Sequence, residues 1–135
     1  MTTNIQLSEA AERLRFKNFR GVFMRDELKN IKAKKYECGI VNLDSSRNEG
    51  SHWVCYLKNN NDKIYFYSFG IQPPLEIVKY LTSPILYNTF QIQQFNEENC
   101  GQWCLHVLNE LNKRQQGSVN ENFIDIILNI INDNK

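Results

Sequence analysis

The sequence predicts an α+β fold in which a central mixed β-sheet of about four strands packs against helices. Short runs of β-branched and aromatic residues gather in the middle of the chain, whereas helical spacing dominates its end. The predicted order is a helix, three strands, a helix, a strand and two helices, which is not the alternation of βαβ units. No repeat or linker divides the 135 residues, so we expect one domain over residues 1–135.

The helices are predicted from N-cap residues and from the spacing of apolar side chains. Ser8 is a suitable N-cap for the first helix, and Leu75, Val78 and Leu81 form one stripe on the second. The predicted helices are Ser8–Lys17, Leu75–Leu81, Cys100–Lys113 and Asn122–Asn132. We expect the helix that begins at Cys100 to lie at the centre of the domain.

The strands are predicted from β-rich runs bounded by polar or turn-forming residues. These runs are Cys38–Leu43, Trp53–Leu57, Ile64–Phe69 and Thr89–Gln93. The polar tract Lys58–Lys63 is predicted to be a hairpin loop between the second and third strands. Phe19–Leu28 is predicted to be a connector with a turn at Gly21.

Composition and charge exclude several classes of function. The net charge is +1, and the one basic cluster, Lys29–Lys35, lacks interleaved aromatic residues, so we do not expect a nucleic-acid-binding protein. No apolar run has membrane-spanning length, and Met1–Gln6 has no signal-peptide pattern. We therefore expect a protein that works inside a cell or a particle, with its four cysteines as thiols.

Periodicity separates the histidines and cysteines by face. Residues four and seven apart share one face of a helix. His106 therefore lies on a polar stripe with Glu110 and Lys113, and we expect it to be exposed. Cys104 lies on an apolar stripe with Leu108, and we expect it to be a core side chain.

The remaining cysteines differ in how easily they can form a thiolate. Side chains alternate between faces along the strand after His52, so Cys55 points away from that histidine. Cys38 follows Glu37, whose carboxylate disfavours a thiolate. Cys100 stands at the start of a helix, where partial positive charge stabilises a thiolate.

Two interpretations of Cys100 and His52 stay open at this point. They can form a thiol–imidazole pair, or they can be a structural cysteine at a helix start and a satisfied histidine at a strand edge. Asn99 is a suitable N-cap, and Gly101 would let the backbone approach a ligand. No metal site is expected, because Cys100 and Cys104 have no second cysteine or histidine pair at zinc-site spacing.

Several segments resemble the cysteine proteases of the adenovirus type and the ubiquitin-like-protein type. They are Gly50–Val54 (GSHWV), Ile64–Gly70 (IYFYSFG), Gln93–Gln94 and Asn99–Cys104 (NCGQWC). Two further segments, Phe19–Asp26 and Cys38–Asp44, are similar to the small capsid-maturation proteases of virophages, Polinton-like mobile elements and large DNA viruses. The resemblance covers about Phe19 to Leu111, and the order of the segments makes it specific.

The resemblance implies a role for each matching residue. His52 matches the general base and Cys100 the nucleophile. Gln94 matches the side chain that forms the oxyanion hole with the Cys100 backbone N–H, with Gln93 as the alternative if the loop register differs. Tyr67 stands where the family usually has Asp or Glu, and a neutral phenol stabilises an imidazolium far less than a carboxylate does.

The implied function is that of a cysteine endopeptidase that processes viral or mobile-element capsid precursors, after a small residue such as glycine. Trp53 is expected to flank the substrate groove or to pack beneath His52. The implied partners are a protein substrate and an activating peptide, with no cofactor; we expect a monomer in the virion or the infected cell. The alternatives are a protease specific for ubiquitin-like proteins and, because of Tyr67, a catalytically impaired binding protein.

Overall fold

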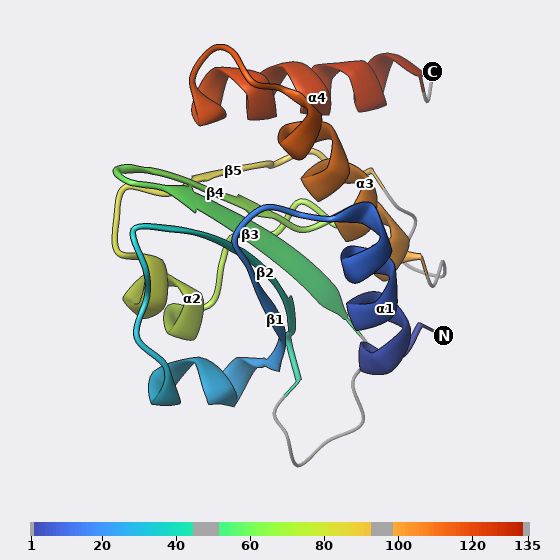
Figure 1. Cartoon of the computed structure of the whole chain (residues 1–135). Helices are drawn as coiled ribbons and strands as arrows, with labels where there is room; N and C mark the ends of the chain where they lie inside the picture. Colours follow the sequence, from blue (N-terminus) through green and yellow to red (C-terminus); the bar gives the residue numbers. More distant parts are fainter. Residues whose placement is uncertain (1, 45–51, 93–98, 134–135) are drawn as a thin grey trace.

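A five-stranded mixed sheet forms the centre of the computed structural model, which describes residues 2–44, 52–92 and 99–133. The strands lie in the order β1-β2-β3-β4-β5 (Figure 1). Their bounds are Phe19–Met24, Tyr36–Asn42, Trp53–Asn59, Asp62–Phe66 and Leu86–Tyr87. The pairings β2–β3 and β3–β4 are antiparallel, whereas the outer pairings β1–β2 and β4–β5 are parallel. The predicted α+β class, with a mixed sheet packed against helices, is confirmed.

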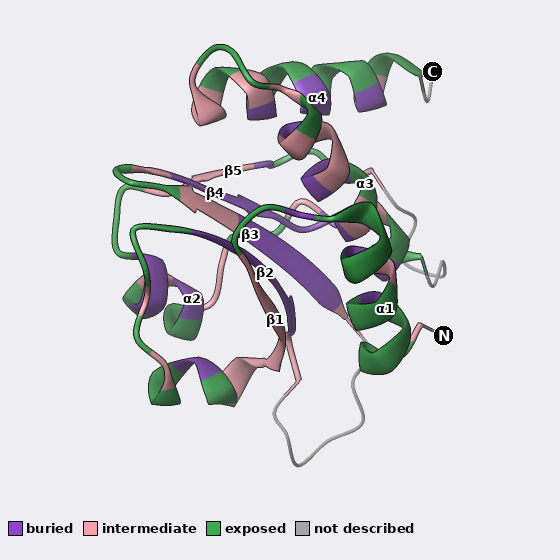
Figure 2. Ribbon diagram, viewed as in Figure 1, coloured by how far each residue is buried: buried purple, intermediate pink, exposed green. Residues whose placement is uncertain are grey.

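Helices cover both faces of the sheet. On one face lie the helices α1 (Asn4–Leu14), α3 (Cys100–Lys113) and α4 (Val119–Asp133). On the other lie the 3₁₀ helix η1 (Arg25–Asn30) and α2 (Leu75–Leu81). Figure 2 shows β3 buried between the two layers. Because side chains alternate along β3, Cys55 joins the first layer and Tyr56 the second, as the sequence predicted.

The helices agree with the predictions except at the N-terminal end of the chain. The helices α2 and α3 have the predicted bounds, and α4 begins a little earlier than expected. The prediction that Ser8 is the first N-cap is wrong. Thr3 is the N-cap of α1, and its side chain and that of Gln6 form a reciprocal capping box. Among the described residues, no helix is both long and apolar enough to span a bilayer.

The predicted hairpin loop Lys58–Lys63 is too long, because β3 extends to Asn59 and β4 runs from Asp62 to Phe66. Two other strands differ more from the sequence prediction. Phe19–Met24, predicted to be part of a connector, is the edge strand β1, and its register with β2 shifts between Phe19 and Val22. This irregularity hides the alternation that normally reveals a strand. The last strand is Leu86–Tyr87, and the described part of the predicted strand Thr89–Gln93 is irregular.

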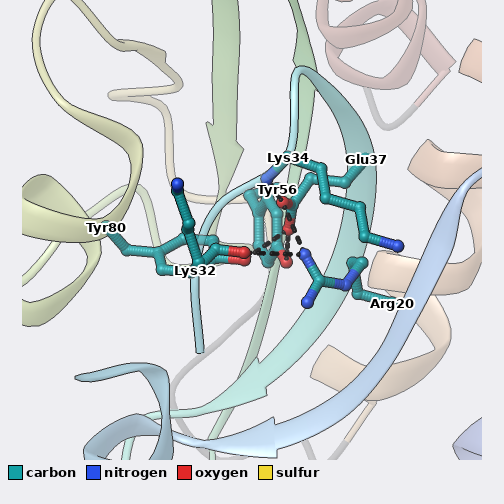
Figure 3. A network of polar contacts seen from close by, with 6 residues as sticks. All are labelled: Arg20, Lys32, Lys34, Glu37, Tyr56 and Tyr80. Carbon is teal, nitrogen blue, oxygen red and sulfur yellow. Dashed lines mark hydrogen bonds and ion pairs between the residues drawn. The ribbon is translucent and has the colours of Figure 1, made fainter. Parts of the chain in front are cut away.

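A buried carboxylate connects several of these elements (Figure 3). The Glu37 side chain, on β2, has no solvent exposure and accepts hydrogen bonds from the hydroxyls of Tyr56 on β3 and Tyr80 on α2. It also accepts a bond from the Lys34 backbone N–H and forms an ion pair of 3.1 Å with Arg20 on β1. Its charge is therefore compensated from two strands, a helix and the segment before β2, as a buried charge requires.

Gly39 makes this arrangement possible. It pairs with Tyr56 in the β2–β3 register, and a Cβ at Gly39 would lie 2.7 Å from the Tyr56 ring and hydroxyl. The phenol therefore crosses the backbone of Gly39 to reach Glu37. This contact needs a residue without a side chain at position 39.

Replacing the buried carboxylate should destabilise the fold. We expect Glu37→Gln to lower the free energy of unfolding by about 3 kcal/mol, because the amide leaves Arg20 without its counter-charge and presents a donor to other donors. Urea unfolding measures this difference. The matched control is Glu76→Gln, which breaks the Arg25–Glu76 pair, whose side chains are 36% and 44% exposed. It should cost less than about 0.5 kcal/mol, and equal losses for the two variants would contradict this role of Glu37.

Candidate active site

The candidate site lies at the end of the sheet where β3 begins. His52 immediately precedes β3, and Cys100 is the first residue of α3. The backbone N–H of Trp53 points at the Cys100 sulfur, with 3.3 Å between N and Sγ. The structure thus joins the start of a strand to the start of a helix, and it brings the candidate nucleophile next to the residue that follows the candidate base.

Packing and one backbone bond hold His52 in place. Its carbonyl accepts a hydrogen bond of 2.8 Å from Leu43 N–H at the end of β2. The imidazole meets the rings of Tyr67 and Phe69 edge-on, at centroid distances of 6.3 and 5.7 Å. Its Nδ1 is buried and has no hydrogen-bond partner within the described part of the chain. Aromatic packing therefore orients this ring.

Tyr67 links the two candidate catalytic residues. Burial raises the pKa of its phenol to about 12, and the neighbouring Cys100, Cys104 and Asp44 add to the rise. Tyr67 is therefore neutral at pH 7 and lies close enough to Cys100 to interact with it electrostatically. Its ring also contacts that of His52, so Tyr67 interacts with both candidate residues, with His52 by packing and with Cys100 through electrostatics.

Asn88 fixes the backbone of Tyr67 from the neighbouring segment. Its side chain accepts a hydrogen bond from Tyr67 N–H at 3.1 Å and donates one to the Tyr67 carbonyl at 2.7 Å. Asn88 is 5% exposed, so this pair of bonds is shielded from water. Sequence analysis missed Asn88, because one asparagine in a chain rich in asparagine carries no local signal.

The first turn of α3, which carries Cys100, is closely packed. Asn99 occupies the N-cap position, as predicted, but its side chain forms no capping bond with the turn. Gly101 is closely packed rather than open: a Cβ there would lie 3.1 Å from Leu7 and 3.4 Å from Thr2 and Trp53. The glycine thus allows α1 and Trp53 to approach the nucleophile-bearing turn.

The other thiols lie inside the core. Burial raises the pKa of Cys38 to about 12, with smaller contributions from Cys55 and Glu37. Burial also raises the pKa of Cys104 well above its ordinary value, and its thiol interacts with Cys55. His106 is exposed on α3, as its helical stripe predicted. These positions agree with the assignment of Cys104 and His106 to structural and surface roles.

The other predicted site residues are Gln94, its alternative Gln93, and Trp53. Gln94 and Gln93 lie outside the described residues, although Ile92 just before them donates a hydrogen bond of 2.7 Å to the Ser68 carbonyl. Trp53 faces the core with 4% exposure, and its substrate-binding role stays a prediction. In residues 2–44, 52–92 and 99–133, no three metal-ligating side chains converge.

The fold is similar to that of solved viral proteases. "Crystal Structure of ASFV pS273R protease" has a TM-score of 0.62 and 15% identity, covering 90% of this chain and 60% of that one. "Crystal Structure of Se-Met ASFV pS273R protease" has a TM-score of 0.64 and 14% identity, covering 91% and 61%. No protein-family model and no curated protein sequence matches the chain.

This chain therefore shares its fold with these two protease structures. The chain spans about three-fifths of their length. At this level of identity the likeness shows the fold, and the chemistry has to be argued from the site itself.

Thiol labelling should reflect the raised pKa values of Cys38 and Cys104. At pH 8 in the folded protein, we expect Cys38 and Cys104 to resist iodoacetamide. This pH lies well below the raised pKa of both thiols, so almost none of either is present as the reactive thiolate. Peptide mass spectrometry measures the extent of alkylation at each cysteine. In urea all four cysteines should react, and rapid labelling of Cys38 in the native protein would contradict its buried position.

The ring of Tyr67, rather than its hydroxyl, should matter for His52. We expect Tyr67→Phe to retain the rate of peptide cleavage within about twofold, because the edge-on ring contact survives. Tyr67→Ala should lower the rate by at least about tenfold, since the imidazole loses a packing partner. Steady-state kinetics measures both. A large loss in Tyr67→Phe alone would show that the hydroxyl orients His52.

Proposed function

We propose that this protein is a cysteine endopeptidase. One observation carries the proposal: the Trp53 N–H meets the Cys100 sulfur at 3.3 Å beside His52, within a fold shared with a viral protease. An N–H donor lowers the energy of a sulfur anion, and the His52 imidazole is the proposed acceptor of the thiol proton. These are the two requirements for a thiol nucleophile near neutral pH.

The proposed reaction proceeds through a covalent thioester. His52 accepts the Cys100 proton, the sulfur attacks the scissile carbonyl, and the carbonyl oxygen becomes an oxyanion. The Cys100 backbone N–H and Gln94 are the proposed oxyanion donors. His52 then gives its proton to the leaving amine, and water hydrolyses the thioester with His52 as base. No cofactor takes part in these steps.

The substrate is proposed from the resemblance and from the neighbouring fold. A viral protease among the structural neighbours supports a protein substrate, and we propose capsid or other virion precursors cut after glycine. A protease specific for ubiquitin-like proteins would instead release a C-terminal tail from a fusion. An assay with both substrate types distinguishes these two activities.

An impaired enzyme is the second candidate, and a specific observation favours it. His52 Nδ1 has no hydrogen-bond acceptor in the described part of the structure, and Tyr67 rather than a carboxylate adjoins the ring. Without that charge the imidazolium is less stable, which slows a step that forms it. In that case the chain binds its protein partner and cleaves it slowly or not at all.

Loss of either paired residue should abolish cleavage. We expect Cys100→Ala to reduce cleavage of a virion-precursor peptide to background, and His52→Ala to lower kcat/KM by at least about a thousandfold. The matched controls are Cys104→Ala and His106→Ala, which change the same residue types on α3 and leave Cys100 and His52 in place. Chromatographic separation of the peptide products measures the rates. Equal cleavage by the wild type and Cys100→Ala would end the assignment.

A further inference from the structure

The residue that precedes the N-cap of α1 contacts the first turn of α3, which carries Cys100. Thr2 precedes α1, and its carbonyl accepts a hydrogen bond of 3.2 Å from the Trp53 indole N–H. Its hydroxyl accepts a second bond, of 2.8 Å, from the Gln102 side chain on the first turn of α3. One residue thus connects the two elements that meet at the Cys100 sulfur.

Van der Waals contacts continue this connection. A Cβ at Gly101 would lie at 3.4 Å from both Thr2 and Trp53, so these two side chains press against the turn that carries Cys100. Leu7 on α1 is fully buried and lies in the same cluster as Cys100 and Trp53. Thr2 is therefore packed against the same turn that carries the Cys100 sulfur.

We propose that Thr2 is a positioning residue for Cys100, which it holds in register with the Trp53 N–H through Trp53 and Gln102. The proposal rests on the proposed function, because it concerns the reactivity of the same thiol. Thr2 lies outside α1, so its two bonds are not needed to form that helix. They connect β3 to α3 at the point where the distance between N–H and sulfur is set.

Thr2 acts through the geometry of the hydrogen bond from the Trp53 N–H to the Cys100 sulfur. The first turn of α3 contacts Thr2 and Trp53, and these neighbours help to hold it in place. A hydrogen bond weakens steeply as distance and angle depart from their optimum. If the Thr2 connection is lost, β3 and the first turn of α3 can shift, and the thiolate loses part of its stabilisation.

The test measures the thiol directly and needs no peptide substrate. The rate of iodoacetamide alkylation at Cys100 is followed as a function of pH by peptide mass spectrometry, with Cys100→Ala as the background. Deletion of residues 1–3 removes both Thr2 acceptors, and Thr3→Ala removes only the cap of α1. Thr2→Val removes the hydroxyl that Gln102 contacts, and Thr2→Ser restores it.

We expect the deletion to slow alkylation at pH 7 by about tenfold and to move the pH midpoint upward. Thr2→Val should slow it by about threefold, whereas Thr2→Ser and Thr3→Ala should match the wild type. Asn112→Ala is a further control, because Asn112 bonds Lys17 N–H at the far end of α3. This variant should lose thermal stability while Cys100 keeps its rate.

Two results would overturn the proposal. An unchanged rate and midpoint in the deletion variant would show that Thr2 serves packing alone. A faster rate would show that the segment covers the thiol rather than positions it. If Cys100 is alkylated at the same rate in the wild type and in His52→Ala, the proposed function itself fails. If alkylation depends on His52 but the Thr2 variants do not show the expected rates, only this inference fails.

Discussion

The contact between the Trp53 N–H and the Cys100 sulfur is the constraint on which the site depends. It requires β3 to begin where α3 begins, although the two residues are 47 positions apart in the sequence. The sheet positions the Trp53 N–H, and the packing of α3 positions the Cys100 sulfur. Antiparallel pairing of β3 with β2 and β4 sets the strand, and the close packing at Gly101 sets the helix.

The same layers give the four cysteines different environments. Cys38, Cys55 and Cys104 lie within the core that the sheet forms with α1, α3 and α4. Burial there raises the pKa of Cys38 and of Cys104. Cys100 is also well buried, but it stands at a helix start and meets a backbone donor. The fold therefore separates a candidate nucleophile from thiols that act as small apolar side chains.

Negative charge is placed away from the candidate site. In the described structure, the rings of Tyr67 and Phe69 pack against His52, and no acceptor reaches its Nδ1. Among the described residues, the buried carboxylate is that of Glu37, whose partners are Arg20, Tyr56 and Tyr80. This carboxylate stabilises the fold, whereas the candidate site relies on a backbone N–H and on ring packing.

Local patterns in the sequence predicted much of this arrangement. Helical spacing predicted the bounds of α2, but Ile77, Tyr80 and Leu81 form its buried side, whereas Leu75 of the predicted stripe is exposed. The alternation along β3 predicted the opposite directions of Cys55 and His52. The edge strand β1 was missed because its register shift disrupts alternation. The roles of Asn88, Thr2 and Glu37 depend on contacts between distant segments, and no spacing in the chain encodes them.

The pairing of Cys100 with His52 can be tested most directly by NMR, because the chain has one histidine at the site and one on the surface. The ring-proton resonances of His52 and His106 are followed with pH in the wild type and in Cys100→Ala. Paired side chains require the midpoint of His52 to fall when the sulfur is removed, while that of His106 stays constant. Superimposable titration curves for His52 in the two proteins would contradict the pairing.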